Sequence, residues 1–372
     1  MIYLDYSATT PVNKEVLDTF NKVSLNFIGN PNSLHKLGAQ SKKLIDDATI
    51  QIANILKVKT SEIIYTSGSS ESNNLAIKGI CEKYERAGKH IITTNLEHSS
   101  IYGPLEYLQK QGYEIDIVKT TNGLVDLEDL KNKLRKDTVL VTIASVNSET
   151  GVKQNIEKIG ELLKNYSCYF HVDATQSIGK INIDFKNVDL ISFSAHKIFG
   201  LKGIGCLIKK EKVDLIPLIH GGKSTTIYRS GTPALPLIVS FSKALRLALA
   251  SLDEKIKKVA ELSDYLKKQL EDLENVTVNS NEYSIPQIVN ISVLNIKPET
   301  MLHALEEDDI YISTQSACSS NNPISRAVKE VTNNEERAKH SLRISISPIT
   351  TKEEIDTFLI SFKKNIKKLN IR

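Results

Sequence analysis

The sequence is poor in cysteine and contains no metal-binding pattern. Its 372 residues include four cysteines, and no two of them form a CxxC pair or lie in a Cys/His cluster with the spacing of a zinc site. They are Cys81, Cys168, Cys206 and Cys318. The sequence therefore predicts neither a disulfide framework nor a structural metal, and it suits a reducing compartment such as the cytoplasm.

Long apolar runs are also missing. No stretch approaches the ~18 apolar residues that suggest a membrane span, and residues Met1 to Asp5 lack the basic and apolar regions of a secretory signal. The 40% hydrophobic and 25% charged residues are typical of a soluble globular protein. The net charge of +4 is spread along the chain, so we expect no membrane contact and no direct nucleic-acid binding.

Short apolar segments alternate with amphipathic ones through the first part of the chain. Strands are predicted at Glu62–Thr66, His90–Thr94, Glu114–Lys119, Thr138–Ala144, Cys168–Asp173, Asp189–Phe193 and Gly205–Lys209. Helices are predicted at Glu71–Ala87, Ser100–Gln111, Leu127–Arg135 and Asn155–Tyr166. This alternation indicates an α/β fold with a mostly parallel seven-stranded sheet covered by helices.

The pattern changes near residue 236. The expected elements are one long helix at Pro236–Leu273, a strand at Gln287–Val293, a helix at Glu299–Glu307, short strands near Tyr311 and at Leu342–Ser347, and a last helix at Thr351–Leu369. We therefore expect two domains. Residues 16–247 would form the large one, and residues 1–15 with 248–372 a smaller α+β domain.

Three motifs follow predicted strands, at the sheet edge where α/β proteins bind ligands. The segment Thr66–Ser72 combines a glycine with small hydroxyl residues and opens a helix, which suits a phosphate, although an ordinary helix cap looks the same. Asp173 ends a buried strand, where a carboxylate needs a cationic partner or serves as a turn cap. Lys197 ends another strand among hydroxyl and imidazole groups, and a lysine there can form a Schiff base or simply lie at the surface.

Further short segments accompany these motifs along nearly the whole chain. They are Tyr3–Asp5, Ala8–Pro11, Gly29–Pro31, Glu97–His98, Val146–Asn147, His171–Ser177, His196–Lys197, Arg229–Thr232, Ser316–Cys318 and Arg343. In their order and spacing they resemble the class V, fold type I pyridoxal-phosphate enzymes, and within them the cysteine desulfurases of the NifS/IscS type. The resemblance implies a homodimer that binds pyridoxal 5'-phosphate and acts on L-cysteine.

The resemblance also implies roles around the cofactor ring. Lys197 would hold the cofactor and move the proton at the substrate Cα. Asp173 would pair with the ring nitrogen and keep the ring an electron sink. His98 would stack on the ring and assist proton transfer, and Gln176 would donate a hydrogen bond to the phenolic oxygen.

The remaining roles concern the phosphate of the cofactor and the carboxylate of the substrate. The phosphate would be bound by Ser69, Ser70, Ser194 and His196, joined by Thr232 of the other subunit. The substrate carboxylate would be held by Arg343, whose planar fork suits it, and by Asn147, which also borders the cofactor. Each of these side chains has an ordinary alternative, since a single histidine or a strand arginine is usually a packed or surface residue.

Cys318 lies in the polar, small-residue segment Ser313–Pro323, which predicts an exposed loop with an ionisable thiol. The other cysteines fall in predicted strands or a helix and are expected to be inert. The resemblance implies that Cys318 accepts the sulfur as a persulfide and passes it to an acceptor. Departures from the family at Gln315 and at Lys223–Thr226 leave open whether that acceptor is an iron–sulfur scaffold or a tRNA-thiolation enzyme.

Other functions remain as alternatives. A selenocysteine lyase or a small-substrate aminotransferase is the nearest, but transamination needs no thiol such as Cys318. A non-catalytic sulfur carrier would need none of Lys197, Asp173, His98 or Arg343. An NAD-dependent enzyme is disfavoured because no GxGxxG follows the first strand.

Overall fold

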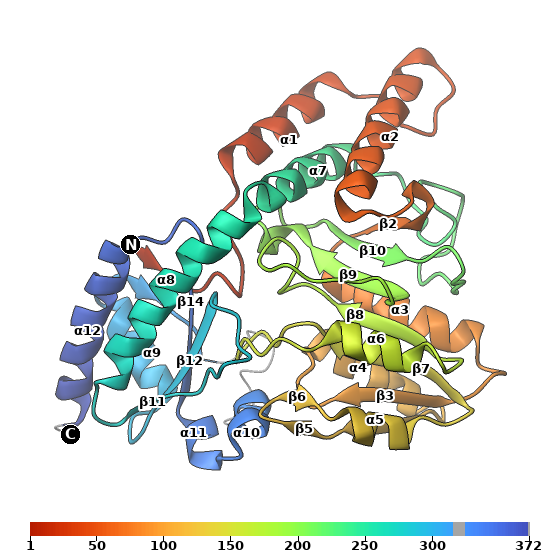
Figure 1. Cartoon of the computed structure of the whole chain (residues 1–372). Helices are drawn as coiled ribbons and strands as arrows, with labels where there is room; N and C mark the ends of the chain where they lie inside the picture. Colours follow the sequence, from red (N-terminus) through yellow and green to blue (C-terminus); the bar gives the residue numbers. More distant parts are fainter. Residues whose placement is uncertain (315–323, 371–372) are drawn as a thin grey trace.

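A computed structural model describes residues 1–314 and 324–370 of the chain (Figure 1). A seven-stranded sheet forms the centre of its larger part, in the order β2–β10–β9–β8–β7–β3–β4. The strands are β2 (Ile63–Thr66), β3 (His90–Thr94), β4 (Glu114–Val118), β7 (Thr138–Ala144), β8 (Tyr169–Asp173), β9 (Leu190–Ser194) and β10 (Gly205–Lys209). Neighbours from β9 to β4 pair in parallel, whereas β10 runs antiparallel to both β9 and β2. The predicted α/β fold with a mostly parallel sheet is confirmed.

Helices pack on both faces of this sheet and divide its side chains between two cores. They are α2 (Lys36–Leu56), α3 (Ser69–Lys83), α4 (Ser99–Gln109), α5 (Leu127–Lys133), α6 (Ile156–Leu163) and α7 (Leu235–Leu249). Successive residues of one strand enter opposite cores, as Ile91 and Ile92 do in β3 and Cys206 and Leu207 in β10. Burial on both faces explains why these strands are apolar almost throughout.

A separate core, called the small core below, is built from the C-terminal residues together with the N-terminus. The two cores on the faces of the seven-stranded sheet are together called the large core. The three-stranded antiparallel sheet of the small core consists of β11 (Val276–Val278), β12 (Ile288–Val293) and β14 (Ser341–Ser345). The helices α8 (Leu252–Glu271), α9 (Pro298–Glu306) and α12 (Lys352–Asn370) pack there, and β1 (Ile2–Tyr3) pairs in parallel with β13 (Ile310–Tyr311). Leu4 is buried in this core. The predicted boundary after residue 247 falls in the last turn of α7 and stays a prediction.

The single helix predicted at Pro236–Leu273 is wrong. It is broken after α7, where Ser251 has a left-handed backbone (φ 50°), and the axes of α7 and α8 differ by 65°. Phe241 of α7 is buried in the large core and Leu266 of α8 in the small one, so one straight helix could not pack both. Among the described residues no single helix is long and apolar enough to cross a membrane, and only this bent pair has the length and composition for it.

Several elements were not predicted. Two are the helices α1 (Lys14–Asn26) and α2, which project from the large core at the top of Figure 1. The signal for α1 was present, because the Asn13 side chain accepts a hydrogen bond from the Glu15 N–H at 2.8 Å and so caps the helix. The others include the strands β1 and β11, the hairpin β5 (Thr120–Thr121) and β6 (Leu124–Val125), and the helices α10 (Arg326–Thr332) and α11 (Glu335–Lys339).

Gly205 allows β10 to pass the start of α3. A Cβ at this position would lie 2.6 Å from the Gly68 Cα and 2.8 Å from the Phe193 carbonyl oxygen, and both are backbone atoms that cannot rotate away. We predict that Gly205→Ala lowers the free energy of unfolding by about 1–3 kcal/mol, as overpacking does, measured by urea denaturation. Gly222→Ala is the control, because Gly222 is exposed and no atom lies within 4 Å of the new Cβ. It should change the free energy of unfolding by less than about 1 kcal/mol, and equal effects of the two variants would contradict the prediction.

Candidate active site

A cavity of about 220 Å³ lies at the carboxyl ends of β7, β8 and β9, against the N-terminal segment and β14. The predicted site residues that line it are Ser69, Ser70, His98, Asp173, Gln176, His196, Lys197 and Arg343. A larger hollow of about 1680 Å³, near Ile181 and Tyr283, contains none of them. The sheet edge predicted from the sequence is therefore where these side chains meet.

Lys197 is held by the turn that follows β9. The strand ends at Ser194, and a short 3₁₀ turn, Ala195–Lys197, points the lysine toward the N-terminal segment. Its Nζ donates hydrogen bonds to the carbonyl oxygens of Ser7 and of Ala8, the latter at 2.7 Å. The amine of Lys197 thus contacts the N-terminal segment at Ser7 and Ala8, which lie 190 and 189 positions earlier in the sequence.

Asp173 and His98 belong to one hydrogen-bond network that the sequence did not reveal. Asn73 of α3 donates from its Nδ2 to the Asp173 Oδ2 at 2.8 Å and to the Ser100 Oγ at 2.9 Å. The Ser100 Oγ lies 2.8 Å from the His98 Nδ1, and the Ser100 N–H donates to the same nitrogen at 3.1 Å. Since the Nδ1 accepts, the proton of a neutral His98 is on Nε2. Burial lowers the pKa of His98, which favours this neutral form.

Asp173 is a buried carboxylate with only neutral donors among these contacts. The Thr175 N–H donates to its Oδ1 at 3.0 Å, and Asn73 serves the other oxygen. Neutral donors do not balance a buried negative charge, so a cation from the cavity would stabilise it. The Thr175 Oγ1 is buried beside the same cavity and has no hydrogen-bond partner within the described part of the chain.

The cavity also has donors for an anion. The 15-residue helix α3 begins at Ser69, so its first N–H groups and the Ser69 and Ser70 hydroxyls lie at the cavity. His196 is close by, and burial together with the charge of Lys197 lowers its pKa to about 4. Ser194 is buried but does not line the cavity, and Thr232 is exposed and does not line it either.

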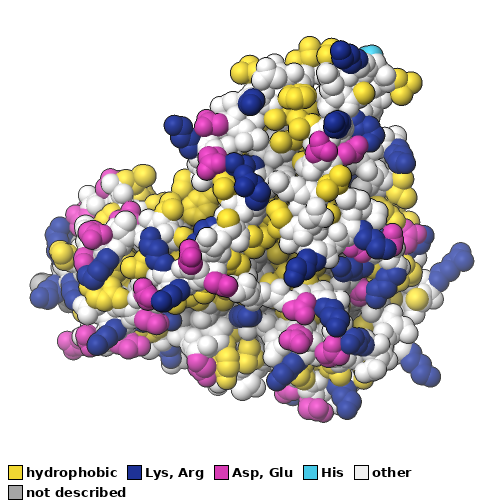
Figure 2. Space-filling model, turned by 45° about the horizontal axis from the view of Figure 1, so that its top comes forward, with side chains coloured by type: hydrophobic (Ala, Val, Ile, Leu, Met, Phe, Trp, Pro, Cys, Tyr) yellow, Lys and Arg dark blue, Asp and Glu magenta, His cyan; other side chains and the backbone are white. Residues whose placement is uncertain are grey.

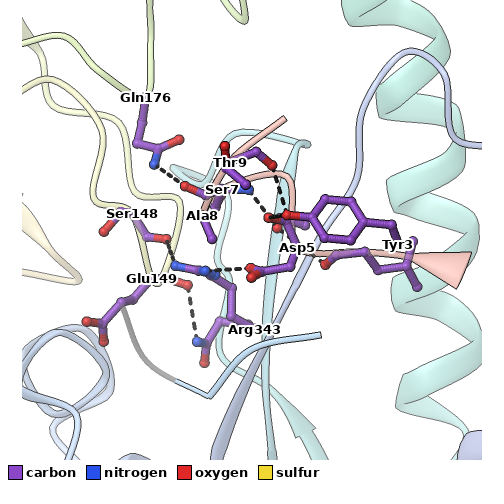
Figure 3. A network of polar contacts seen from close by, with 12 residues as sticks. Tyr3, Asp5, Ser7, Ala8, Thr9, Ser148, Glu149, Gln176 and Arg343 are labelled. Carbon is purple, nitrogen blue, oxygen red and sulfur yellow. Dashed lines mark hydrogen bonds and ion pairs between the residues drawn. The ribbon is translucent and has the colours of Figure 1, made fainter. Parts of the chain in front are cut away.

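Arg343 is already paired by the chain itself (Figure 3). Its side chain is 1% exposed, and its Nη2 donates to the Asp5 Oδ1 at 2.7 Å and its Nη1 to the Ser148 carbonyl oxygen at 3.0 Å. A substrate carboxylate would therefore share this guanidinium with Asp5. Asn147 does not line the cavity, and its Oδ1 accepts three hydrogen bonds from Glu149 and Thr150 in the following turn. Its predicted contact with substrate or cofactor stays a prediction.

Cys318 and Gln315 lie outside the described residues, but the flanks of their segment are placed. Ser313 exchanges backbone hydrogen bonds with Arg343, at 2.7 and 3.1 Å. Ser325 donates from its Oγ to the buried Glu149 Oε2 at 2.6 Å.

Glu97 is a buried carboxyl group next to His98 in the sequence. Its two oxygens accept from the Ala144 N–H at 2.9 and 3.1 Å, and its Oε1 also accepts from the Thr94 hydroxyl at 2.7 Å. Burial raises the pKa of Glu97 to about 8, although these hydrogen bonds lower it. Glu97 therefore ties the end of β3 to the end of β7 beside the cavity.

Sequence comparison assigns the family. The pattern of the aminotransferase class-V family matches residues 2–358. The cysteine desulfurase IscS of Dictyoglomus turgidum is 38% identical and aligns with 99% of this chain and 95% of its own length. That of Buchnera aphidicola subsp. Baizongia pistaciae is 40% identical over 99% of this chain and 93% of its own. The chain belongs to the class-V aminotransferase family, in its cysteine desulfurase branch.

Solved structures agree with this membership. A NifS-like protein superimposes with a TM-score of 0.94 at 33% identity, covering 99% of this chain and all of its own. SspA in complex with cysteine gives a TM-score of 0.83 at 30% identity, covering 94% of this chain and 100% of SspA. The family predicted from the sequence motifs is confirmed.

The raised pKa of Glu97 predicts a pH-dependent stability. The folded chain binds a proton that the unfolded chain releases above the ordinary pKa of 4.5, so Glu97 destabilises the fold progressively from there to about pH 8. The Glu97→Gln variant has no carboxyl group at this position, so it does not lose stability in this way as the pH rises. The stability of the variant relative to the wild type should rise by up to about 1.4 kcal/mol per pH unit between pH 5 and 8.

Urea midpoints at several pH values measure this difference. Glu106→Gln, at an exposed position on α4, controls for the loss of one carboxyl group. A Glu97→Gln variant whose stability relative to the wild type does not change with pH would show that Glu97 is ionised in the folded chain.

Proposed function

We propose that the chain is a pyridoxal-phosphate-dependent cysteine desulfurase that converts L-cysteine to L-alanine and transfers the sulfur to Cys318. The observation that carries this proposal is the meeting of Lys197, Asp173 and His98 at one cavity with Arg343. The backbone of Arg343 in turn pairs with Ser313, which leads into the Cys318 segment. The names of the relatives and the cysteine in the SspA structure support the same activity.

The groups around the cavity fit pyridoxal phosphate. The Asp173 carboxylate suits a protonated ring nitrogen, the Thr175 hydroxyl has an unused hydrogen-bond capacity, and the start of α3 with Ser69 and Ser70 suits a phosphate. Lys197 would hold the cofactor through its amine. When bound, the cofactor withdraws electrons from the bonds at the substrate Cα.

The remaining work is done by residues of the chain. Arg343 would orient the substrate through its carboxylate. The Lys197 amine would move the proton at the Cα, and the neutral His98 would donate from its Nε2. The Cys318 thiolate would attack the substrate sulfur, so that an S–S bond forms as the Cβ–S bond breaks. The three-carbon fragment takes up protons and leaves as alanine, and the sulfur remains on Cys318 as a persulfide.

The persulfide would be passed to an acceptor protein. We propose an iron–sulfur scaffold or a tRNA-thiolation enzyme, and the IscS name of the relatives favours the first. The cytoplasmic location predicted from the sequence stays a prediction.

The activity is tested with purified protein, L-cysteine and a reductant, by measuring alanine and sulfide together with the visible absorbance of the bound cofactor. Lys197→Ala should lose the normal absorbance and at least about 100-fold of the turnover. Cys318→Ala should keep the absorbance and lose sulfide release. Cys168→Ala is the matched control, because burial raises the pKa of that thiol to about 12, and it should remain active. Full sulfide release by Cys318→Ala would rule out the persulfide step.

We also propose that the chain is a homodimer whose contact includes α1 and the segment leading into α2. Exposed apolar side chains gather there, and Figure 2 shows them as yellow atoms on the projecting part of the molecule. They are Leu17, Leu25, Ile28, Leu34 and Leu37. Such an apolar surface is typical of a protein contact. Thr232 is exposed and does not line the cavity of its own chain, as is expected of a residue that serves a second copy.

Sedimentation equilibrium tests this contact. Leu25→Asp combined with Ile28→Asp should shift the chain from dimer to monomer by placing two charges in the buried interface. Ile360→Asp on α12 is the control, since Ile360 is 71% exposed against 81% for Ile28. A double variant that stays dimeric would show that the dimer interface does not include Leu25 and Ile28.

A further inference from the structure

Lys180 is a second lysine connected to the candidate active site. Its Nζ donates to the Gln176 Oε1 at 2.5 Å, four residues earlier in the chain. The Gln176 Nε2 donates in turn to the Ser7 carbonyl oxygen at 3.0 Å, and the Lys197 Nζ donates to that same oxygen. One hydrogen-bonded chain therefore runs from Lys180 through Gln176 and Ser7 to Lys197.

This chain determines which way the Gln176 amide faces. The Ser7 carbonyl oxygen only accepts, so the amide atom that meets it is the nitrogen and the amide oxygen faces Lys180. The amide nitrogen consequently faces Ser7, as the contact in Figure 3 shows, and it keeps a second N–H for another acceptor. Gln176 lines the 220 Å³ cavity, so a ligand there meets a donor and not an oxygen.

The surroundings of Lys180 are unusual for a lysine. It lines a cavity of about 160 Å³ behind Lys197, and no acidic side chain of the described residues lines that cavity. Gln287 borders it too and donates from its Nε2 to the Lys180 carbonyl oxygen at 2.7 Å, which fixes the backbone. Burial, with the positive charges of Lys197 and Arg343, lowers the pKa of Lys180 well below its ordinary range.

A role in packing alone does not explain this position. An apolar side chain of similar length would fill the same space without the free-energy cost of removing an amine from water. The contact that only a donor can make is the one to the Gln176 oxygen. The specific contribution of Lys180 is therefore directed at Gln176.

We propose that Lys180 is a positioning residue that acts through Gln176. It holds the amide so that an N–H of Gln176 faces the phenolic oxygen of pyridoxal phosphate. The inference rests on the proposed function, because it requires this cofactor in the cavity.

The test compares Lys180→Met with the wild type in two measurements other than turnover. One is the Kd of the apoprotein for pyridoxal phosphate, which should rise about 10-fold because a hydrogen bond to a charged oxygen is lost. The other is the pH titration of the visible absorbance of the bound cofactor. Its midpoint should move up on the order of one unit, since a weaker hydrogen bond to the phenolic oxygen destabilises the deprotonated form.

Matched variants separate this role from stability. Lys255 lines the same cavity, and burial lowers its pKa as well, but its Nζ donates to the Leu247 and Ala248 carbonyl oxygens at the end of α7. Lys255→Met should leave the Kd and the titration midpoint unchanged. Lys180→Arg keeps the donors and the charge and should restore most of both values.

The outcomes distinguish the inference from the function on which it rests. A Lys180→Met variant that binds and titrates like the wild type overturns the role of Lys180 and leaves the proposed function standing. A wild-type chain that shows no visible absorbance with pyridoxal phosphate overturns the proposed function itself. If Lys180→Met does not fold, Lys180→Leu provides the test, because it also removes the donor. It should raise the Kd and the midpoint in the same way, and wild-type values of both would contradict the inference.

Discussion

The carbonyl oxygen of Ser7 accepts hydrogen bonds from both Lys197 and Gln176, and the candidate active site depends on this contact. The segment that carries it is buried in the small core at Leu4, and the Thr10 N–H donates to the His196 carbonyl oxygen in the large one. Asp5 in the same segment pairs with Arg343. The segment from Leu4 to Thr10 thus connects the groups proposed to hold the cofactor with the group proposed to hold the substrate.

This arrangement explains why the site contains few charges that face each other. Besides the Asp5–Arg343 pair and the Asp173 carboxylate, burial favours the neutral forms of His98, His196 and Glu97 in or beside the cavity. Asp173 is supported by the amide of Asn73 and a backbone N–H. A cationic ring nitrogen would therefore meet a carboxylate that no arginine or lysine already neutralises through these contacts. Neutral donors orient such a group without competing for the charge.

Much of the fold was predictable because it depends on local patterns. The predicted bounds of β3, β7 and β10 agree with the structure, since strands buried on both faces are rich in apolar and β-branched residues. The break at Ser251 was not predictable in the same way. The apolar pattern continues from α7 into α8, and only the position of two separate cores requires the chain to change direction between them. Helix α1 was also predictable, because Asn13 caps its start and this cap is recognisable in the sequence.

In the candidate active site, too, some features follow from local sequence patterns and others from the tertiary structure alone. The sequence by itself determined which residues end the strands of a parallel sheet, and Asp173 and Lys197 reach the cavity for that reason, with Ser69 at the start of the helix after β2. Only the tertiary structure decided the partners that orient them. Asn73 lies 100 residues from Asp173, Asp5 lies 338 from Arg343, and Ser7 lies 190 from Lys197. No local pattern records such contacts, because a hydrogen bond depends on the distance between two atoms in space and not on their separation along the chain.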